Sequence, residues 1–206
     1  MRIVAISDTH TRHKQIKIPP GDVLIHAGDF SGYGHLWEAK NFFDWLVTLP
    51  HKHKVVVAGN HDRAFEMFSK DARALVPSGV VYLQDEEATV GGLKIYGSPW
   101  QPFFLNWAFN VVRGELWRKW QWIPEKLDIL ITHGPPSGNL GGVLNGEELG
   151  DEELYDAIMK KRPRLHVSGH IHGGHGRREK DGIIFVNAAI CTEEYAPTNP
   201  PIVVDL

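Results

Sequence analysis

Residues that could bind metal ions recur at the ends of short apolar runs in the sequence. They comprise two aspartates, one asparagine and four histidines, several of them next to glycine. Such a mixture of oxygen and imidazole ligands, without sulfur, suits hard-to-borderline divalent cations. The residues are Asp8, His10, Asp29, Asn60, His133, His170 and His172.

Each of these motifs has an ordinary structural reading when taken alone. Asp8 and His10 could cap a helix or a turn, Gly28-Asp29 is a common turn pair, and His133 could be a hydrogen-bonded loop histidine. His170-x-His172 is the strongest single motif, because alternate residues at the end of a strand project in the same direction. The whole set in strand order favours a metal centre.

The elements that must position these residues are short runs rich in Val, Ile and Leu. Near-continuous apolar runs are typical of strands buried on both faces of a sheet. In open α/β sheets, ligands bind beyond the carboxyl ends of the strands. We therefore expect the five strand ends to converge on one crevice. The runs are residues 3–6, 23–25, 55–57, 129–131 and 165–167.

Other segments complete a mixed α/β chain. Helical spacing predicts helices over residues 36–49, 63–75 and 152–161. The Gly91-Gly92 pair predicts a tight hairpin turn in an antiparallel segment. No repeat or linker interrupts residues 1–206, so a single domain is expected. Strands are predicted over residues 80–82, 88–90, 93–96, 183–186 and 202–204.

The combined motifs resemble the signature of the calcineurin-like metallophosphoesterase superfamily. Further motifs resemble the MPPED group of class III cyclic nucleotide phosphodiesterases. Some members of that group carry glycine where this chain has His170, and are impaired for it. The motifs that resemble this group are Gly97-Ser98-Pro99-Trp100, Thr132-His133-Gly134-Pro135-Pro136, Phe185-Val186-Asn187-Ala188 and Pro197-Thr198-Asn199-Pro200-Pro201.

The resemblance implies an α/β fold, the two-sheet α/β/β/α sandwich, with two divalent metal ions at the strand ends. One metal would be held by Asp8, His10 and His172, and the other by Asn60, His133 and His170. Asp29 would bridge them. The same ligand set serves Mn, Fe, Zn, Ni or Co, so the identity of the metals stays open.

The resemblance also implies a catalytic role for His61, which faces the substrate in this superfamily. We interpret His61 as the general acid for the leaving oxygen. Asp62 is interpreted as the carboxylate that orients the His61 ring, with an N-terminal helix residue as the alternative.

The implied activity is hydrolysis of phosphate diesters by a metal-bridging hydroxide, with 2′,3′-cyclic nucleotides as the leading substrates and 3′,5′-cyclic nucleotides second. A broad-specificity phosphomonoesterase or a nuclease is the enzymatic alternative. A metal-binding interaction module is the non-enzymatic one. The expected partner is a small phosphodiester or nucleotide, and a homodimer stays open.

The composition of the chain argues against several classes of partner and site. The chain has 206 residues with 25 acidic and 22 basic side chains, so no global positive field points to a stable nucleic-acid complex. Its one cysteine, Cys191, excludes an internal disulfide and a cysteine-built zinc finger, and favours a cytoplasmic location. No apolar run is long enough to suggest a membrane span.

Four further features are interpreted as follows. The aromatic residues between Trp100 and Trp122 could stack on nucleobases, but core packing or a dimer surface is favoured. Arg113, Arg177 and Arg178 could reach a phosphate, but solvated surface is favoured. Residues 138–146 lack the lysine of a nucleotide P-loop and are expected to form a mobile loop, and His51 is expected in a solvated loop.

Overall fold

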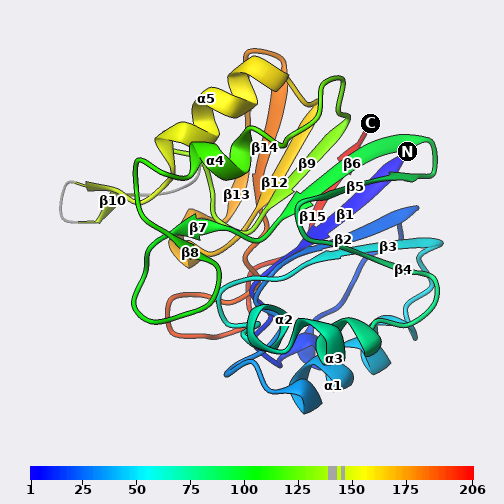
Figure 1. Cartoon of the computed structure of the whole chain (residues 1–206). Coiled ribbons are helices and arrows are strands. Elements are labelled where there is room, and N and C mark those ends of the chain that lie inside the picture. The colour runs from blue at the N-terminus through cyan, green and yellow to red at the C-terminus, as the bar shows by residue number, and fades with distance from the viewer. Residues whose placement is uncertain (139–142, 145–146) are drawn as a thin grey trace.

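The computed structural model describes residues 1–138, 143–144 and 147–206, in which two large β-sheets lie face to face (Figure 1). Helices cover the outer face of each sheet. The predicted four-layer α/β/β/α architecture is therefore confirmed.

The first sheet has the strand order β15-β1-β2-β3-β4. Strands β1 to β4 run parallel, and β15 pairs antiparallel with β1. The carboxyl ends of β1, β2 and β3 therefore meet at one edge. The bounds are β1 (Arg2–Ile6), β2 (Val23–Ala27), β3 (His53–Val57), β4 (Val80–Leu83) and β15 (Ile202–Asp205).

The second sheet has the order β13-β14-β12-β9-β6-β5. Its inner strands β14, β12, β9 and β6 are parallel, while β13 and β5 are antiparallel edges. The bounds are β5 (Glu86–Val90), β6 (Leu93–Ser98), β9 (Ile129–Thr132), β12 (Leu165–Ser168), β13 (Gly176–Lys180) and β14 (Ile183–Asn187). Short pairs are formed by β7 (Gln101–Pro102) with β8 (Asn110–Val111) and by β10 (Val143–Leu144) with β11 (Glu147–Glu148).

Helices α1 (Leu36–Leu46), α2 (Ala64–Met67) and α3 (Ser69–Ala74) pack on the first sheet. Helices α4 (Trp117–Trp120) and α5 (Glu152–Lys161) pack on the second. Two single 3₁₀ turns are η1 (His13–Gln15) and η2 (His172–Gly174).

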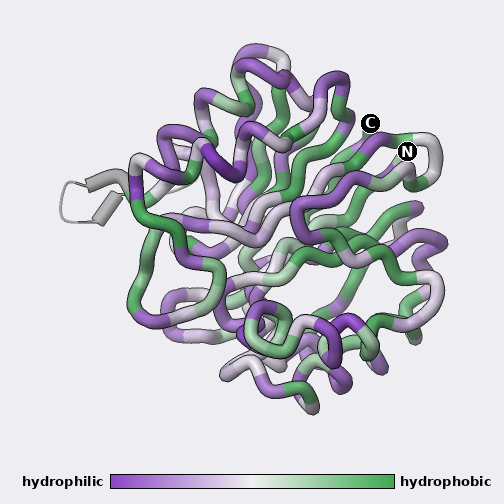
Figure 2. Tube along the Cα trace, in the orientation of Figure 1, coloured by the Kyte–Doolittle hydropathy of each residue, from purple (hydrophilic) through white to green (hydrophobic). Residues whose placement is uncertain are grey.

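Strand β1 shows why the inner strands are apolar throughout. Ile3 and Ala5 point into the core between the sheets, whereas Val4 and Ile6 point into the core under the helices. All four are fully buried. Successive side chains alternate between two apolar layers, so hydrophobic residues run along the strands without a polar face (Figure 2).

Several sequence predictions are confirmed and others need correction. The 152–161 helix and the Gly91-Gly92 hairpin are as expected. The 36–49 helix ends three residues early, at Leu46. The 63–75 helix is broken at Phe68, whose φ of −128° and ψ of 44° separate α2 from α3. Strand β13 was not predicted.

No described helix is long and apolar enough to cross a membrane. Most of the segment 138–146, for which a loop is expected, lies outside the described residues. The single domain over residues 1–206 stays a prediction.

Candidate metal centre

The seven predicted metal ligands lie together where strand ends of the two sheets meet. Three strands of the first sheet and two of the second supply them, and the atoms concerned are separated by a few ångströms. β1 is followed by Asp8 and His10, β2 by Asp29, β3 by Asn60, β9 by His133, and β12 by His170 and His172.

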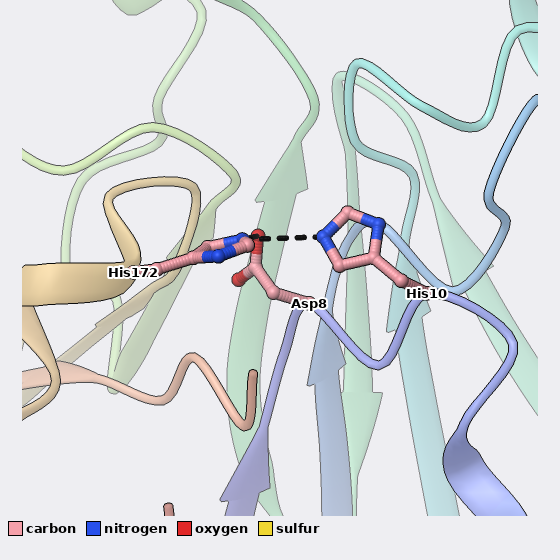
Figure 3. Close-up of side chains that lie close together, drawn as sticks. All are labelled: Asp8, His10 and His172. Atoms are coloured by element: carbon pink, nitrogen blue, oxygen red, sulfur yellow. Dashed lines mark hydrogen bonds and ion pairs between the residues drawn. The ribbon is translucent and has the colours of Figure 1, made fainter. Parts of the chain in front are cut away.

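Asp8, His10 and His172 form the first group (Figure 3). The Nε2 atoms of His10 and His172 face each other at 3.2 Å, and His172 Nε2 lies 3.4 Å from Asp8 Oδ1. Each imidazole also contacts a backbone carbonyl through Nδ1. His10 Nδ1 lies 3.3 Å from Ser31 O, and His172 Nδ1 lies 2.8 Å from Thr192 O.

Those carbonyls fix the chemistry of the first group. A carbonyl can only accept, so each Nδ1 carries the hydrogen, and a neutral imidazole then turns the lone pair of Nε2 toward the other ring. Two lone pairs at this distance repel each other unless a proton or a cation lies between them. The donor set therefore fits a divalent cation.

Asp29, His133, His170 and Asn60 form the second group. Asn60 Oδ1 lies 2.9 Å from His133 Nε2 and 2.8 Å from His170 Nδ1, and Asp29 Oδ2 lies 3.4 Å from His133 Nε2. His133 Nδ1 donates to Ala27 O at 2.9 Å, so Nε2 is the ring atom that faces the acceptor oxygens of Asn60 and Asp29, and a proton or a cation must lie between them. This group also fits a cation.

Asp29 reaches both groups. Its Oδ2 is 3.4 Å from His133 Nε2 and 3.9 Å from His10 Nε2. A carboxylate between two groups of imidazoles can share its charge between two cations. This position agrees with the predicted bridging role, and the assignment of each residue to a metal stays a prediction.

The pKa values of the centre shift in both directions, according to whether burial or a nearby carboxylate dominates. Burial lowers the pKa of His10 to about 4 and that of His170 to about 3, so both rings are neutral at neutral pH and could offer a lone pair to a cation. Burial also lowers the pKa of His133, but the charge and hydrogen bond of Asp29, the charge of Asp8 and the hydrogen bond to Ala27 together outweigh it and raise the pKa to about 9. Burial raises the pKa of Asp29, but the charges of His133, His61 and His10 and the hydrogen bond with His133 together lower it well below its ordinary value.

Several of these residues have strained backbones. Asp8, His10, Asp29 and His170 have φ values of 52°, 40°, 58° and 65°, in the left-handed region. This region costs a non-glycine residue on the order of 1–3 kcal/mol, and such residues cluster at functional sites. The turns are therefore less stable than relaxed ones, and their shape aims these side chains at one point.

Glycines beside the ligands permit the close approach. A Cβ atom on Gly59 would collide with Asp29 Oδ1, and one on Gly169 would collide with Asp8 Oδ2. The absence of a side chain lets the turn after one strand lie against the carboxylate of another. This is the physical reason for glycine in the Gly59-Asn60 and Gly169-His170 pairs.

His170 and His172 come together for a reason that differs from the one expected. They follow β12 instead of continuing it, and His170 has left-handed backbone while His172 begins η2. His170 consequently points to Asn60, and His172 points to Asp8. The prediction that both rings project in the same direction is wrong, although both reach the centre.

His61 lies beside the centre and is oriented by a carbonyl. Its Nδ1 donates to Gly32 O at 2.7 Å, and its ring stacks on Trp107 with centroids 4.0 Å apart. One of its ring nitrogens lies within 4.8 Å of ligand atoms of His10 and Asp29. Geometry alone therefore admits His61 either as a general acid or as a ligand.

Asp62 does not orient His61, so that prediction is wrong. Its fully buried carboxylate accepts the backbone N–H groups of Asp29, Ser31 and Gly59 at 2.8, 2.9 and 2.8 Å. Burial and the charge of Asp29 raise the pKa of Asp62 to about 8, and the N–H donors oppose this rise. Asp62 instead ties the turn after β2 to the turn after β3.

Glu38 was not predicted from the sequence, although it supports His61 indirectly, through the turn that contains Gly32. Its buried carboxylate accepts the N–H groups of Gly32, Tyr33 and His35 at 3.1, 3.1 and 2.8 Å. Gly32 is the residue whose carbonyl holds His61. The sequence does contain a signal for this role, because Glu38 lies three residues after the helix N-cap His35, which is the spacing of a capping box.

A cavity of about 460 Å³ opens over the centre. Its polar lining includes Asp29, Asn60, His61, His170 and His172, and its size is within the range that holds small organic ligands.

Arg113 also lines the cavity and donates to the carbonyls of Gly150 and Leu149. Arg177 and Arg178 lie on the exposed edge strand β13 instead.

The aromatic stretch divides between core and surface. Trp120 and Phe109 are buried as the core interpretation predicts, whereas Phe103 and Phe104 are 64% and 49% exposed and line the cavity. Trp117 and Trp122 are 51% and 56% exposed. No single interpretation therefore covers the stretch.

Known proteins resemble this chain in sequence. The family model of the calcineurin-like phosphoesterases matches residues 1–174. Metallophosphoesterase domain-containing protein 1 of Homo sapiens is 45% identical over 230 residues, which cover 100% of this chain and 71% of that protein. UPF0046 protein T07D4.2 of Caenorhabditis elegans is 37% identical over 237 residues, covering 100% of this chain and 60% of that protein.

The fold has counterparts among solved structures. The crystal structure of TT1561 of Thermus thermophilus matches with a TM-score of 0.63 and 13% identity, over 90% of this chain and 88% of that chain. Such low identity shows the fold alone. The family resemblance seen in the motifs is confirmed by the sequence matches: the chain belongs to the calcineurin-like phosphoesterases, a family of metal-dependent hydrolases.

Proposed function

We propose that this protein is a phosphodiesterase whose substrates are small cyclic nucleotides, with the 2′,3′-cyclic kind first. Asp8, His10 and His172 would hold one divalent cation, and Asn60, His133 and His170 a second, with Asp29 shared. Bound cations would activate water for attack on phosphorus and neutralise charge on the phosphate oxygens.

The observation that carries the preference for diesters is the charge around the cavity. Among the described residues that line it, Arg113 is cationic, while Asp29 and Glu193 are acidic. A phosphate monoester carries about −1.5 to −2 charges at pH 7, whereas a diester carries −1. The lining therefore supplies little positive charge beyond the cations to balance a monoester.

His61 would serve the leaving oxygen. Because its Nδ1–H is committed to Gly32 O, Nε2 is the ring atom that can exchange a proton with a substrate. Opening of a cyclic nucleotide expels a ribose hydroxyl, which needs a proton as it leaves. Stacking on Trp107 at 4.0 Å holds the plane of the ring.

The test is substrate profiling of the protein reconstituted with Mn²⁺. The kcat/KM values for 2′,3′-cyclic AMP, 3′,5′-cyclic AMP, a linear dinucleotide and AMP are compared before and after chelation. Faster turnover of AMP than of both cyclic substrates would refute the diester preference.

Metal content measured on the same preparation tests the metal centre. About two metals per chain are expected. Asp29→Asn should lose metal, while the surface variant Asp44→Asn, 63% exposed at its side chain, should keep it. Full metal binding without turnover of any ester would favour the interaction-module alternative.

A further inference from the structure

The residues that line the cavity over the metal centre are of two chemical kinds. Asp29, Asn60 and the histidines form a polar floor. Pro102, Phe103, Phe104, Ile171 and Tyr195 contribute apolar and aromatic surface to the rest of the lining. A bare phosphate would use the floor alone.

We propose that Phe103 and Phe104 form an aromatic wall that binds the nucleobase of a nucleotide whose phosphate lies on the polar floor. This inference rests on the proposed function for the position of the phosphate. It assigns the base-binding surface, which the metal ligands do not provide.

Exposure of the two rings is the first argument. Phe103 and Phe104 leave 64% and 49% of their surface exposed although both line the cavity. Side chains of this size bury roughly 150–250 Å² when they are packed, so exposure forfeits much of that stabilisation. A planar ligand would recover it.

The distance to the centre is the second argument. The centroid of the Phe104 ring is 5.8 Å from that of His170, whose Nδ1 faces Asn60. Phe104 of the wall thus lies next to the floor. Tyr195 lines the same cavity and makes ring contacts with His10 and His172 at 4.8 and 5.3 Å.

The third argument is that the loop carrying the wall is held in place. The side chain of Asn110 accepts from the backbone N–H of Phe104 and donates to the carbonyls of Leu105 and Trp107, each at 3.0 Å. Phe103 N–H donates to Val111 O at 2.9 Å. The rings are therefore presented by a fixed turn, which lowers the ordering cost of binding.

The occupant follows from this combination. A ligand must carry an anionic phosphate at one end and a planar apolar face at the other. Nucleobases bind aromatic side chains through their faces with little dependence on sequence, whereas an aliphatic phosphate ester would gain less from planar rings. The near absence of positive charge beyond Arg113 in the described lining argues against a polyphosphate chain along this wall.

The test measures equilibrium binding by calorimetry with the Mn²⁺-loaded protein. Its probes are AMP and ribose 5-phosphate, which share the sugar and the phosphate but differ in the base. The wild type should bind AMP about 5- to 150-fold more tightly, the range expected for stacking on an aromatic side chain.

The variants localise that preference. Phe103→Ala/Phe104→Ala should bind AMP and ribose 5-phosphate within about twofold of each other, with ribose 5-phosphate unchanged from the wild type. Phe103→Leu/Phe104→Leu keeps apolar volume without planar rings and should lose most of the preference. The matched control Phe68→Ala removes a phenylalanine that is 56% exposed outside the cavity and should bind like the wild type.

Three results would overturn the wall: equal or absent binding of AMP by the wild type, a variant that weakens both probes equally, or a leucine variant that keeps the preference. Hydrolysis of 2′,3′-cyclic AMP on the same preparations separates the two proposals. Selective AMP binding without turnover would refute the diesterase and retain the wall. Turnover without selective AMP binding would retain the diesterase and refute the wall.

Discussion

Replacing Glu38 by glutamine should slow catalysis without releasing metal. The Glu38 carboxylate holds the turn that contains Gly32, and the carbonyl of Gly32 receives Nδ1–H of His61. A glutamine fits the same space but presents one acceptor oxygen and one N–H₂ group. One of the backbone donors on this turn must then face another donor.

The magnitude follows from the contacts. Glu38 is 3% exposed, and its two oxygens accept N–H groups at 2.8 to 3.3 Å. A hydrogen bond to a charged group contributes about 1.5–3 kcal/mol, and the substitution removes one such bond. For a chain of this size the loss lowers Tm by about 3–12 °C.

The assay combines thermal unfolding, metal content and turnover. The Glu38→Gln protein should keep its metals and lose more activity toward a cyclic nucleotide than toward a nitrophenyl diester, because only the ribose hydroxyl needs a proton from His61. The matched control is Asp44→Asn on the same helix, which breaks an exposed pair with Lys40 at 2.6 Å and should cost about 0.5 kcal/mol or less. A Glu38→Gln protein as stable as this control, or one with equal loss on both substrates, would refute the reasoning.

Three further changes test other parts of the structure. His170→Gly should lower metal content and diesterase activity strongly with an unchanged circular dichroism spectrum, and excess Mn²⁺ should restore part of the activity; full metal and turnover would remove His170 from the ligand set. His61→Ala should keep both metals and lose about 10²- to 10⁴-fold in rate on cyclic nucleotides, whereas lost metal would make His61 a ligand. Burial lowers the pKa of His166 to about 3 in the folded protein, below the ordinary value of 6.5, so its contribution to stability is present above pH 6.5 and is lost as pH falls toward 3. Between pH 7 and 5 this loss is about 2 kcal/mol, and urea unfolding of His166→Gln should show a correspondingly shallower fall than the wild type.

The sequence predicted the strand ends and the residues at the centre because both depend on local patterns. Buried strands need runs of apolar residues, and β1, β2 and β3 contain them at residues 3–6, 23–25 and 55–57. The turns that follow need glycine where backbone approaches a carboxylate, as at Gly59 and Gly169. Both requirements are met by residues that are adjacent in the chain, so the sequence alone can reveal them.

The remaining errors concern residues whose partners are distant in the chain. His51, expected in a solvated loop, is 3% exposed and has its Nε2 3.0 Å from Pro19 O. Asp62 faces the backbone of Asp29 and Ser31, about thirty residues away, instead of the adjacent His61. Strand β13 has the polar sequence of an exposed edge and owes its form to pairing with β14. Local propensity depends on residues that are close in the chain, so it cannot predict partners that are distant in the sequence.

The left-handed backbone at His170 has a consequence for how this kind of protein can change. With φ at 65°, a side chain at this position works against folding, and glycine would relieve that penalty. Replacing His170, a proposed ligand, by glycine therefore also relaxes the backbone, which offsets part of the stability lost with the side chain. Glycine at this position is therefore compatible with the fold on backbone grounds, even where it would cost the centre a side chain.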